Sequence, residues 1–349
     1  MFAPHADSRL TGGRIRAKRL LAALALALSL APGTFIRTEL PQNFDDNLYV
    51  EAVSDLPETV SANGFRREGV WHLTSPNIEF GGYSALLVPG AGKADLWAFS
   101  DRGSRLILSA PDGQSRQTPR LSRVGNRGRL RGTIPDIEAA AHDESTGSYW
   151  LAFENSNAII RYSVASELEA LREPPEWRDW PANSGAEAME RLPDGRFIVL
   201  QEASNTGLVF DGDPTGDVAS FEFRYELPGD YAATDLATLP DGRVLILLRR
   251  LAFGYPPFTA ALAIGDPRDL AAGHDLPISM LVNLDTLLPR ENYEGLAIAP
   301  QDDGAIVLWI IADDNRASFQ RTLLAKLVWA APDAHEKARE EIPRAPSNP

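Results

Sequence analysis

The sequence predicts an all-β protein of the β-propeller class, with five four-stranded blades. The first supporting observation is a pentapeptide, Leu192-Pro193-Asp194-Gly195-Arg196, that recurs unchanged 47 residues later at Leu239-Pro240-Asp241-Gly242-Arg243. The second is that each copy lies between two apolar runs, which is the pattern of a β-hairpin. The third is a related unit of about 50 residues that recurs along the chain, and this is the spacing of propeller blades.

The unit can be followed five times through its opening strand. The openings are Ser84-Ala85-Leu86, Glu138-Ala139-Ala140, Glu187-Ala188-Met189, Asp235-Leu236-Ala237 and Glu294-Gly295-Leu296. Each opening precedes an apolar strand that ends in polar residues. These second strands are Leu96–Arg102, Tyr149–Asn155, Phe197–Ala203, Val244–Arg250 and Leu308–Asp314. A short third strand follows in each unit, and we expect fourth strands in Ser220–Leu227 and Pro277–Leu284. Leu168–Trp180 falls outside the pattern and is expected to be a loop or short helix.

The ring must close on itself, and the last unit has no evident fourth strand after Trp329. We expect the N-terminal segment Phe65–Leu73 to supply that strand, because closure removes exposed sheet edges. Six blades are the alternative count, with the extra blade drawn from Leu48–Leu73 or contained in a long unit. A pair of β-sandwiches is the alternative all-β fold, but it does not explain the unchanged pentapeptide.

Residues 1–31 have the pattern of an export signal. Five basic residues precede a run of Leu, Ala and one Ser from Leu20 to Ala31. That run is shorter than the roughly 20 residues of a membrane-spanning helix and suits a signal peptide. A cleaved signal and an uncleaved membrane anchor both stay open. We therefore expect a periplasmic or secreted protein, attached to the inner membrane only if the signal is retained.

The remaining chain divides into three parts. Residues 32–64 form an N-terminal extension, residues 65–330 form the propeller domain, and residues 331–349, which are Pro-rich and charged, are expected to be a disordered tail.

The chain is strongly acidic, with a formal net charge of −14. Without residues 1–31 it keeps 29 basic and 47 acidic side chains, a net charge of −18. Such a chain repels nucleic acids and anionic membrane surfaces, so neither is an expected partner. It contains no cysteine, which excludes disulfides and thiolate chemistry. We expect a monomer.

Alignment of the five units places polar residues in two columns. The opening column contains Ser84, Glu138, Glu187, Asp235 and Glu294. The column at the end of the second strand contains Asp101, Glu154, Glu202, Arg249 and Asp313. The first strand of each propeller blade lines the central channel. The opening column therefore predicts a ring of four carboxylates and one serine at the channel mouth.

This ring has the chemistry of a site for a hard cation. Neighbouring carboxylates raise one another's pKa unless a cation lies between them. Oxygen ligands on loops and strand ends favour Ca²⁺ or Mg²⁺ over softer metals. The candidate metal ligands are Asp101, Glu138, Glu187, Asp235, Glu294 and Asp313. The alternative is that these acids are solvated, or that they bond backbone amides of neighbouring blades.

Arginines stand among these acids at Arg102, Arg249 and Arg250. A guanidinium group can hold a phosphate or carboxylate through paired hydrogen bonds. The alternative for each arginine is an inter-blade ion pair. The sequence carries no metalloprotease motif, no nucleophile-elbow motif and no Gly-rich phosphate loop.

Six motifs in order carry a family resemblance. They are Gly81-Gly82-Tyr83-Ser84-Ala85-Leu86, Ser100-Asp101-Arg102-Gly103, Asp136-Ile137-Glu138-Ala139, Gly185-Ala186-Glu187-Ala188-Met189, Tyr293-Glu294-Gly295-Leu296-Ala297 and Asp313-Asp314-Asn315. Together they resemble the bacterial phytase-like domain family, labelled "esterase-like activity of phytase", over roughly residues 66–329. The resemblance implies an exported propeller that hydrolyses phosphate or other esters, with calcium as cofactor. The pair Arg249-Arg250 departs from a wholly acidic cluster.

Three functional hypotheses follow. The first is a metal-dependent hydrolase of small anionic phosphate or carboxylic esters, with Glu187 and Glu294 as catalytic candidates and Arg102 and Arg249 as substrate contacts. The second is a non-catalytic propeller that binds a ligand or protein partner in the cell envelope. The third is a lactonase-like propeller, which applies the same metal chemistry to a cyclic ester.

Overall fold

The computed structural model describes residues 42–57, 60–90, 95–113, 118–125, 135–177, 180, 185–201, 204–300, 305–317 and 320–330. One compact unit begins at Phe44 and holds the strands of the described part. The expected export signal at residues 1–31 and the expected tail at residues 331–349 lie outside the described residues. No helix in the described ranges is long and apolar enough to span a membrane.

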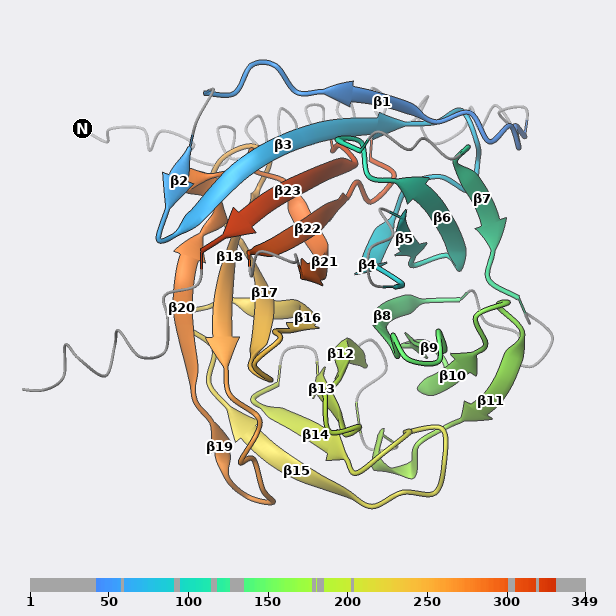
Figure 1. Ribbon diagram of the computed structural model, residues 1–349, viewed down its shortest axis with the longest axis vertical. Coiled ribbons are helices and arrows are strands. Elements are labelled where there is room, and N and C mark those ends of the chain that lie inside the picture. The colour runs from blue at the N-terminus through green and yellow to red at the C-terminus, as the bar shows by residue number, and fades with distance from the viewer. Residues whose placement is uncertain are drawn as a thin grey trace, which may run out of the picture. The chain divides into compact units, whose positions relative to one another are not determined.

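Five small sheets surround a common centre and form a five-bladed β-propeller (Figure 1). Blade 1 contains β4 (Tyr83–Leu87), β5 (Asp95–Ser100), β6 (Ser104–Ser109) and β7 (Arg120–Arg123). Blade 2 contains β8 (Ile137–His142), β9 (Tyr149–Phe153), β10 (Ala158–Tyr162) and β11 (Leu168–Arg172), followed by the 3₁₀ turn η1 (Pro175–Trp177). Blade 3 contains β12 (Ala186–Arg191), β13 (Phe197–Gln201), β14 (Thr206–Phe210) and β15 (Ser220–Tyr225), with β19 (Asp275–Leu276) added in parallel at its edge. The predicted fold class and blade count are confirmed.

The last two blades follow the same plan. Blade 4 contains β16 (Ala232–Thr238), β17 (Val244–Leu251), β18 (Phe258–Gly265) and β20 (Ile278–Asn283), with the 3₁₀ turn η2 (Leu284–Thr286) after it. Blade 5 contains β21 (Asn292–Pro300), β22 (Ile306–Asp313), β23 (Leu323–Trp329), β3 (Phe65–Thr74) and β1 (Tyr49–Ala52), and β2 (Ser61–Ala62) also pairs with β3. The predicted fourth strands are confirmed as β15 and β20. The expectation of a loop or helix over residues 168–180 is wrong at its start, because Leu168–Arg172 pairs with β10 as an outer strand.

An N-terminal strand closes the ring, as predicted. Strand β3 pairs antiparallel with β23, with a register that runs from Phe65 opposite Trp329 to His72 opposite Leu323. The rings of Phe65 and Trp329 are both buried and stack with centroids 4.9 Å apart. Because β3 pairs with β23 and joins the two ends of the propeller within one sheet, β23 is not left as an open edge of the last blade.

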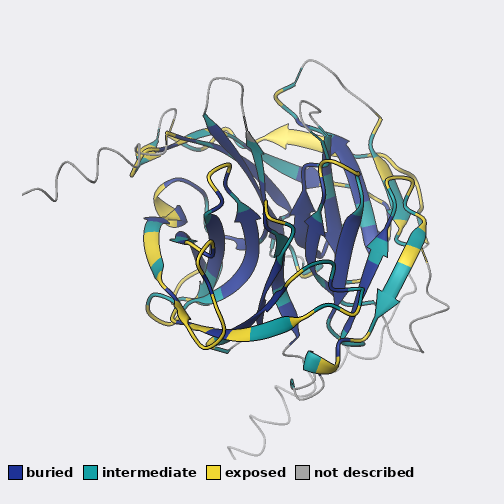
Figure 2. Cartoon of the chain, turned by 60° about the horizontal axis from the view of Figure 1, so that its bottom comes forward, coloured by how far each residue is buried: buried dark blue, intermediate teal, exposed yellow. Residues whose placement is uncertain are grey.

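The core lies between the blades. The buried apolar residues form five clusters, and each cluster draws on two neighbouring blades. Trp150 on β9, for example, packs edge-on against Phe197 on β13 across the joint of blades 2 and 3, with ring centroids 4.9 Å apart. Figure 2 shows the inner strands largely buried and the outer strands partly exposed. Adjacent blades therefore stabilise one another through sheet-on-sheet packing.

The innermost strands β4, β8, β12, β16 and β21 each contact the inner strands of both neighbouring blades. In all five, one residue near the start is skipped in the pairing with the second strand. The skipped residues are Ser84, Glu138, Glu187, Thr234 and Glu294. The predicted opening column is therefore wrong in blade 4, where Thr234 and not Asp235 takes the bulged position. The prediction aligned Asp235 with the glutamates of the other blades because all are carboxylates. The residues that are equivalent in the structure are set by the backbone register instead.

The repeated pentapeptide forms the turn between the first and second strands of blades 3 and 4. The amide of Leu192 donates to the carbonyl of Arg196 at 2.8 Å, and Leu239 donates to Arg243 at 2.7 Å. Gly195 and Gly242 adopt φ of 89° and 88°, a backbone region that favours glycine. Because the inner strands start at the bulges and end at these turns, the turns lie at the opposite end of the channel from the bulges.

Candidate functional site

The two predicted polar columns meet at one mouth of the channel. The inner and second strands of each blade are antiparallel, so the start of one lies beside the end of the other. Asp101 and Glu154 directly follow β5 and β9, while Arg249 and Asp313 pair with Ala232 and Asn292 at the starts of β16 and β21. Glu202 lies outside the described residues. We call this end of the channel the acidic mouth.

The bulged positions carry three carboxylates and two hydroxyls, not four carboxylates and one serine. The Ser84 hydroxyl donates to the carbonyl of Ile137, the residue before Glu138 in the next blade. Thr234 makes the equivalent bond to the carbonyl of Tyr293 at 3.4 Å. These hydroxyls join neighbouring blades, whereas Glu138, Glu187 and Glu294 supply the charge of the ring.

Blade 2 brings three carboxylates together. One oxygen from each of Asp136, Glu138 and Glu154 lies within 4.8 Å of the other two. Burial raises the pKa of Asp136 to about 6, and the Glu154 carboxylate adds to that effect. Burial and then the charge of Glu187 hold the pKa of Glu138 well above its usual range. Among the described residues no ion pair compensates the charge of this group, which is the condition that a bound cation relieves.

The neighbouring chain fits closely around this group. The amide of Gly185 donates to Oε1 of Glu154 at 3.1 Å. A Cβ atom at position 185 would lie 2.6 Å from Cγ of Glu154, so only glycine allows this approach. Sequence reasoning proposed Glu138 as a ligand but gave no role to Asp136. Its spacing of two residues from Glu138, at the entry to the same inner strand, is the signal that could have found it.

Blades 4 and 5 form a second group of polar side chains, in which the positive charge of an arginine balances the carboxylates. Arg249 is ion-paired with Glu294 and donates to Oδ1 of Asn292 at 2.9 Å. Asn292 donates in turn to Oε1 of Glu294 at 2.8 Å. Burial raises the pKa of Asp313 to about 9, with a further contribution from the Glu294 charge. Asp313 therefore keeps its proton at neutral pH and shares a hydrogen bond with Glu294.

A third group lies where blade 5 meets blade 1. Oδ1 of Asp314 accepts from the amides of Gly82 at 3.0 Å and Arg316 at 2.9 Å. Oδ1 of Asp101 is buried and has no hydrogen-bond partner among the described residues. Burial raises the pKa of Asp101, and the charges of Arg102 and Arg316 oppose that shift. Arg102 is exposed.

Sequence reasoning missed Arg316. Its Nη1 donates to the carbonyl of Ile78 at 2.8 Å, while Nε and Nη2 are buried and have no partner within the described part of the chain. Asn315 and Arg316 adopt φ of 45° and 49°, in the left-handed region. Such conformations are uncommon for residues other than glycine and recur at ligand sites. The preceding Asp313-Asp314 pair was the only nearby sequence signal.

The remaining predicted residues have different places. Glu187 occupies the bulge of β12, and its charge raises the pKa of both Glu138 and Arg249. Asp235 is fully buried below the ring, where its carboxylate accepts from the backbone amides of Leu236 and Leu296. It therefore does not join the acidic mouth. This is the role in bonding backbone amides that the sequence left open as an alternative.

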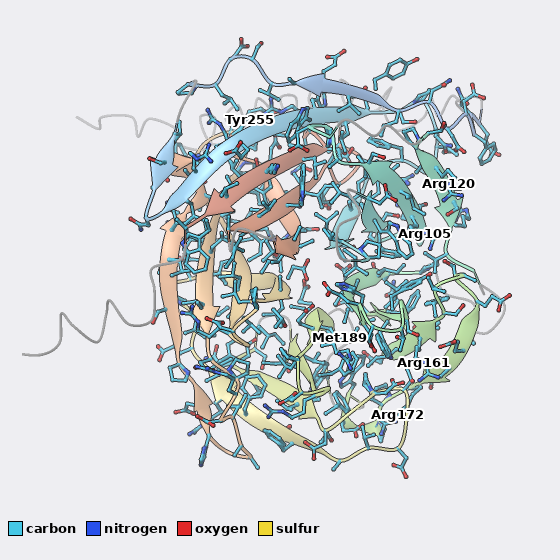
Figure 3. All side chains as sticks on the ribbon, viewed as in Figure 1. Arg105, Arg120, Arg161, Arg172, Met189 and Tyr255 are labelled. Carbon is cyan, nitrogen blue, oxygen red and sulfur yellow. The ribbon has the colours of Figure 1, made fainter. Side chains whose placement is uncertain are left out.

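The remaining predicted arginine, Arg250, contacts residues directly before the first strand of its own blade. Arg250 pairs with Asp230 at 2.8 Å and lies over the Tyr231 ring, apart from Arg249. Figure 3 shows four further arginines on the outer parts of two blades, whereas Met189 of β12 lies near the centre. These four are Arg105, Arg120, Arg161 and Arg172. The positive charge relevant to the acidic mouth thus comes from Arg102, Arg249 and Arg316.

Fold and site together define a class of protein, a five-bladed propeller with carboxylates and arginines gathered at one channel mouth. A family model described as "Phytase-like: Esterase-like activity of phytase" matches residues 78–316, which is more than half of the chain. The chain therefore belongs to the phytase-like family.

Other comparisons give distant similarities. No curated protein matches the chain. Among solved structures, Kuenenia stuttgartiensis hydrazine synthase is similar at 14% identity and a TM-score of 0.35, over 73% of this chain and 64% of that one. This chain thus spans less than two thirds of the hydrazine synthase chain. U3-55K matches at 9% identity and a TM-score of 0.42, over 81% and 99% of the two chains. A luciferin-regenerating enzyme matches at 10% identity and a TM-score of 0.41, over 80% of this chain and 95% of that one.

Proposed function

We propose that this chain is an exported hydrolase of small anionic esters that uses Ca²⁺ at its acidic mouth. The observation that carries the proposal is the convergence of Asp136, Glu138 and Glu154 within 4.8 Å in blade 2. Membership of a family described by esterase-like activity supports hydrolysis. The substrate class follows from the arginines on the other side of the same mouth.

The three carboxylates fit the coordination geometry of Ca²⁺. Oxygen ligands lie at about 2.3–2.6 Å from this ion, so two of them are separated by at most about 5 Å. The 4.8 Å limit among the blade 2 oxygens meets this condition. Ca²⁺ takes more ligands than three, which leaves positions for substrate and water. When bound, it would polarise a substrate oxygen and lower the pKa of a water.

The chain's own residues can supply proton transfer. Asp313 is protonated at neutral pH and can donate a proton to the leaving oxygen. Burial raises the pKa of Glu294 and its ion pair with Arg249 opposes that shift, while a hydrogen bond between Glu294 and Asp313 fixes the position of the Asp313 carboxyl. We assign the acceptance of a proton from the attacking water to Glu187, the remaining carboxylate of the ring.

Anion binding falls to Arg102 and Arg316. Arg249 was the sequence-based candidate, but its guanidinium is committed to Glu294 and Asn292. Arg316 has two buried donors without a partner among the described residues, and Arg102 is exposed beside it. Two guanidinium groups at one edge of the mouth suit a phosphate or carboxylate group of the substrate.

The test combines metal binding with turnover. Purified mature protein is assayed with p-nitrophenyl phosphate, p-nitrophenyl acetate and a lactone, with Ca²⁺ or with chelator. We expect turnover of one ester class only with Ca²⁺, and a loss of about a hundredfold or more in Glu154→Gln. The matched control is Glu222→Gln, which changes an exposed carboxylate on β15 and should keep full activity.

The outcomes separate the candidate functions. Calcium binding by calorimetry that is lost in Glu154→Gln, together with no turnover on any ester, would favour the non-catalytic binding propeller of the envelope. Preference for the lactone would favour the lactonase-like alternative. Turnover that is unaffected by chelator and by Glu154→Gln would contradict a calcium site in blade 2.

Export is a part of the proposal that rests on residues 1–31 alone. We infer that the signal directs the chain to the periplasm or beyond. Fractionation of expressing cells followed by N-terminal sequencing tests this. A new N-terminus near Ala31 in the periplasmic fraction supports a cleaved signal, and an intact N-terminus in the membrane fraction supports an anchor. Full-length protein confined to the cytoplasm would contradict both.

A further inference from the structure

A second polar cavity lies at the opposite end of the channel from the acidic mouth. It has a volume of about 560 Å³ and is lined by the ends of all five inner strands. The two repeated turns border it through Leu192-Pro193 and Leu239-Pro240. Much of its wall is apolar, with Leu86, Val88, Leu236, Leu296 and Ile298 among the lining residues. We call it the turn-side cavity.

One carboxyl enters this cavity where the other blades have aliphatic residues. Glu190 pairs with Ile198 on the second strand of blade 3. Ile198 lies four residues before Glu202, the blade 3 member of the column at the end of the second strand. The equivalent residues in the other blades are Leu87, Ala141, Ala237 and Ala297. Of these residues, Leu87, Ala237 and Ala297 line the cavity, and Glu190 is the one titratable residue among the five equivalent positions.

Glu190 accepts a hydrogen bond but forms no ion pair with any residue that the structure describes. Its Oε1 accepts from the amide of Thr238 at 3.4 Å. The nearest arginine, Arg191, has its guanidinium 3.6 Å from Asp143, to which it is paired. Placing an ionised carboxylate in a largely apolar wall is unfavourable unless a positive group compensates it.

The side-chain donors of the cavity wall, on Ser145, Thr238 and Arg191, are bonded within the protein. Acceptors remain. Both ring nitrogens of His142 are buried and have no hydrogen-bond partner among the described residues. Burial lowers the pKa of His142, so the ring is neutral and offers one acceptor nitrogen and one N–H donor to a ligand. Asp143 and Glu144 add carboxylates at the rim. Buried polar atoms are usually satisfied, so this surplus of acceptors calls for a donor-rich ligand.

We propose that the turn-side cavity binds a small organic cation, with a primary ammonium group on Glu190 and an apolar body against the leucine walls. An ammonium group has three donors and no acceptor, which matches the acceptors that converge here. The negative net charge of the chain, −14, also attracts cations to the cavity. This site is separate from the acidic mouth and does not depend on the proposed hydrolase activity.

The test uses three probes of one shape and different charge. Calorimetric titration of the wild-type protein with n-hexylammonium, n-hexanol and n-hexanoate is expected to show saturable one-to-one binding of the ammonium only. Glu190→Gln keeps an acceptor for Thr238 and removes the charge. It is expected to weaken hexylammonium binding about tenfold to a hundredfold, the range for a hydrogen bond to a charged group.

Two further variants separate the site from general effects. Ala297→Leu fills the cavity without a change of charge and should also abolish hexylammonium binding, provided that its thermal unfolding midpoint shows a folded protein. Glu222→Gln, far from the cavity on an outer strand, should bind as the wild type does. The proposal is overturned by no binding at about 10 mM hexylammonium, by equal binding in Glu190→Gln, or by equal binding of hexanoate.

Discussion

The buried carboxylate of Asp235 on β16 accepts a hydrogen bond from the backbone amide of Leu296 on β21, with 2.6 Å between the two atoms. It also accepts from its neighbour Leu236 at 2.8 Å and from the amide of Leu86 on β4. A Cβ at Gly295 would lie 3.0 Å from the Leu86 nitrogen, so the strands are close at this point. One side chain thus joins blades 4, 5 and 1 below the acidic mouth.

Asp235→Ala is expected to destabilise the fold by about 3 kcal/mol or more. The substitution leaves the amides of Leu296 and Leu86 buried without an acceptor, and each such group costs about 1–3 kcal/mol. Urea unfolding at pH 7 measures the change. Asp269→Ala removes an exposed carboxylate and should stay within about 0.5 kcal/mol of the wild type. Equal stabilities of the two variants would show that Asp235 does not join the blades.

Phe65→Ala tests the closure of the ring. The Phe65 ring is fully buried and stacks on Trp329, so its removal leaves a cavity where the two ends of the propeller meet. We expect a loss of about 3–5 kcal/mol in the free energy of unfolding. Val50→Ala, on the outermost strand β1 of the same blade, is the matched control and should cost much less because Val50 is partly exposed. A small effect of Phe65→Ala would place the closing contact elsewhere.

Glu138→Gln should have opposite effects with and without Ca²⁺. Burial and the charges of neighbouring carboxylates raise the pKa of Glu138, so its ionised form opposes folding above about pH 4.5. In chelator at pH 7 the neutral variant should therefore unfold at a higher temperature than the wild type. In millimolar Ca²⁺ the order should reverse, because the variant loses a ligand and with it the ligand-linked stabilisation. Scanning calorimetry measures the unfolding temperatures of both proteins in both buffers. If the same protein is the more stable one in chelator and in Ca²⁺, the result argues against a calcium site.

The apo protein should lose stability as the pH rises from about 6 to about 9. Burial, followed by the Glu294 charge, raises the pKa of Asp313 to about 9, against about 4 in an unfolded chain. Because the folded pKa is the higher one, this contribution is complete below about pH 4 and declines until the pH passes the folded value. The slope from this one group is at most about 1.4 kcal/mol per pH unit. Urea unfolding in chelator should show a flatter profile for Asp313→Asn than for Asp269→Asn.

The fold could be predicted because its evidence is repeated. The pentapeptide turns and the recurrent apolar strands both indicate the same four-stranded unit. A misassigned residue within one unit therefore does not change the predicted number of blades. The bulged position could not be placed as safely, because a β-bulge is defined by hydrogen-bond register and leaves no fixed residue type in the sequence. The sequence therefore predicts Asp235 in the ring, whereas Thr234 occupies the bulged position.

The site was predicted in part, and the omissions have a common cause. Glu138, Glu294 and Asp313 could be proposed because carboxylates recur at equivalent positions of the repeat, and Arg249 because it stands in the same column as Asp313. Arg316 and Glu190 were missed, because each is a departure of one blade from the others. A repeat identifies what the blades share, whereas a residue found in a single blade needs coordinates to show what it faces.

The affinity of the turn-side cavity for hexylammonium should rise with pH and level off near pH 8. Burial raises the pKa of Glu190 to about 8, so its carboxyl is mostly protonated at pH 7, whereas the ammonium group binds the ionised form. Affinity should therefore increase about tenfold per unit below pH 8, while the ammonium stays charged up to about pH 10. The other titratable or charged groups around Glu190 are His142, Asp143, Glu144, Arg191 and Asp235.

Calorimetry in two buffers of different ionisation enthalpy should report close to one proton released per hexylammonium bound at pH 7. Glu144→Gln, at the exposed rim of the same cavity, is the matched control and should keep both the proton release and the pH slope. Glu190→Gln should remove both, since the residual binding then has no coupled carboxyl. Affinity that does not vary between about pH 6 and pH 9 in the wild type would show that the ammonium group does not contact Glu190.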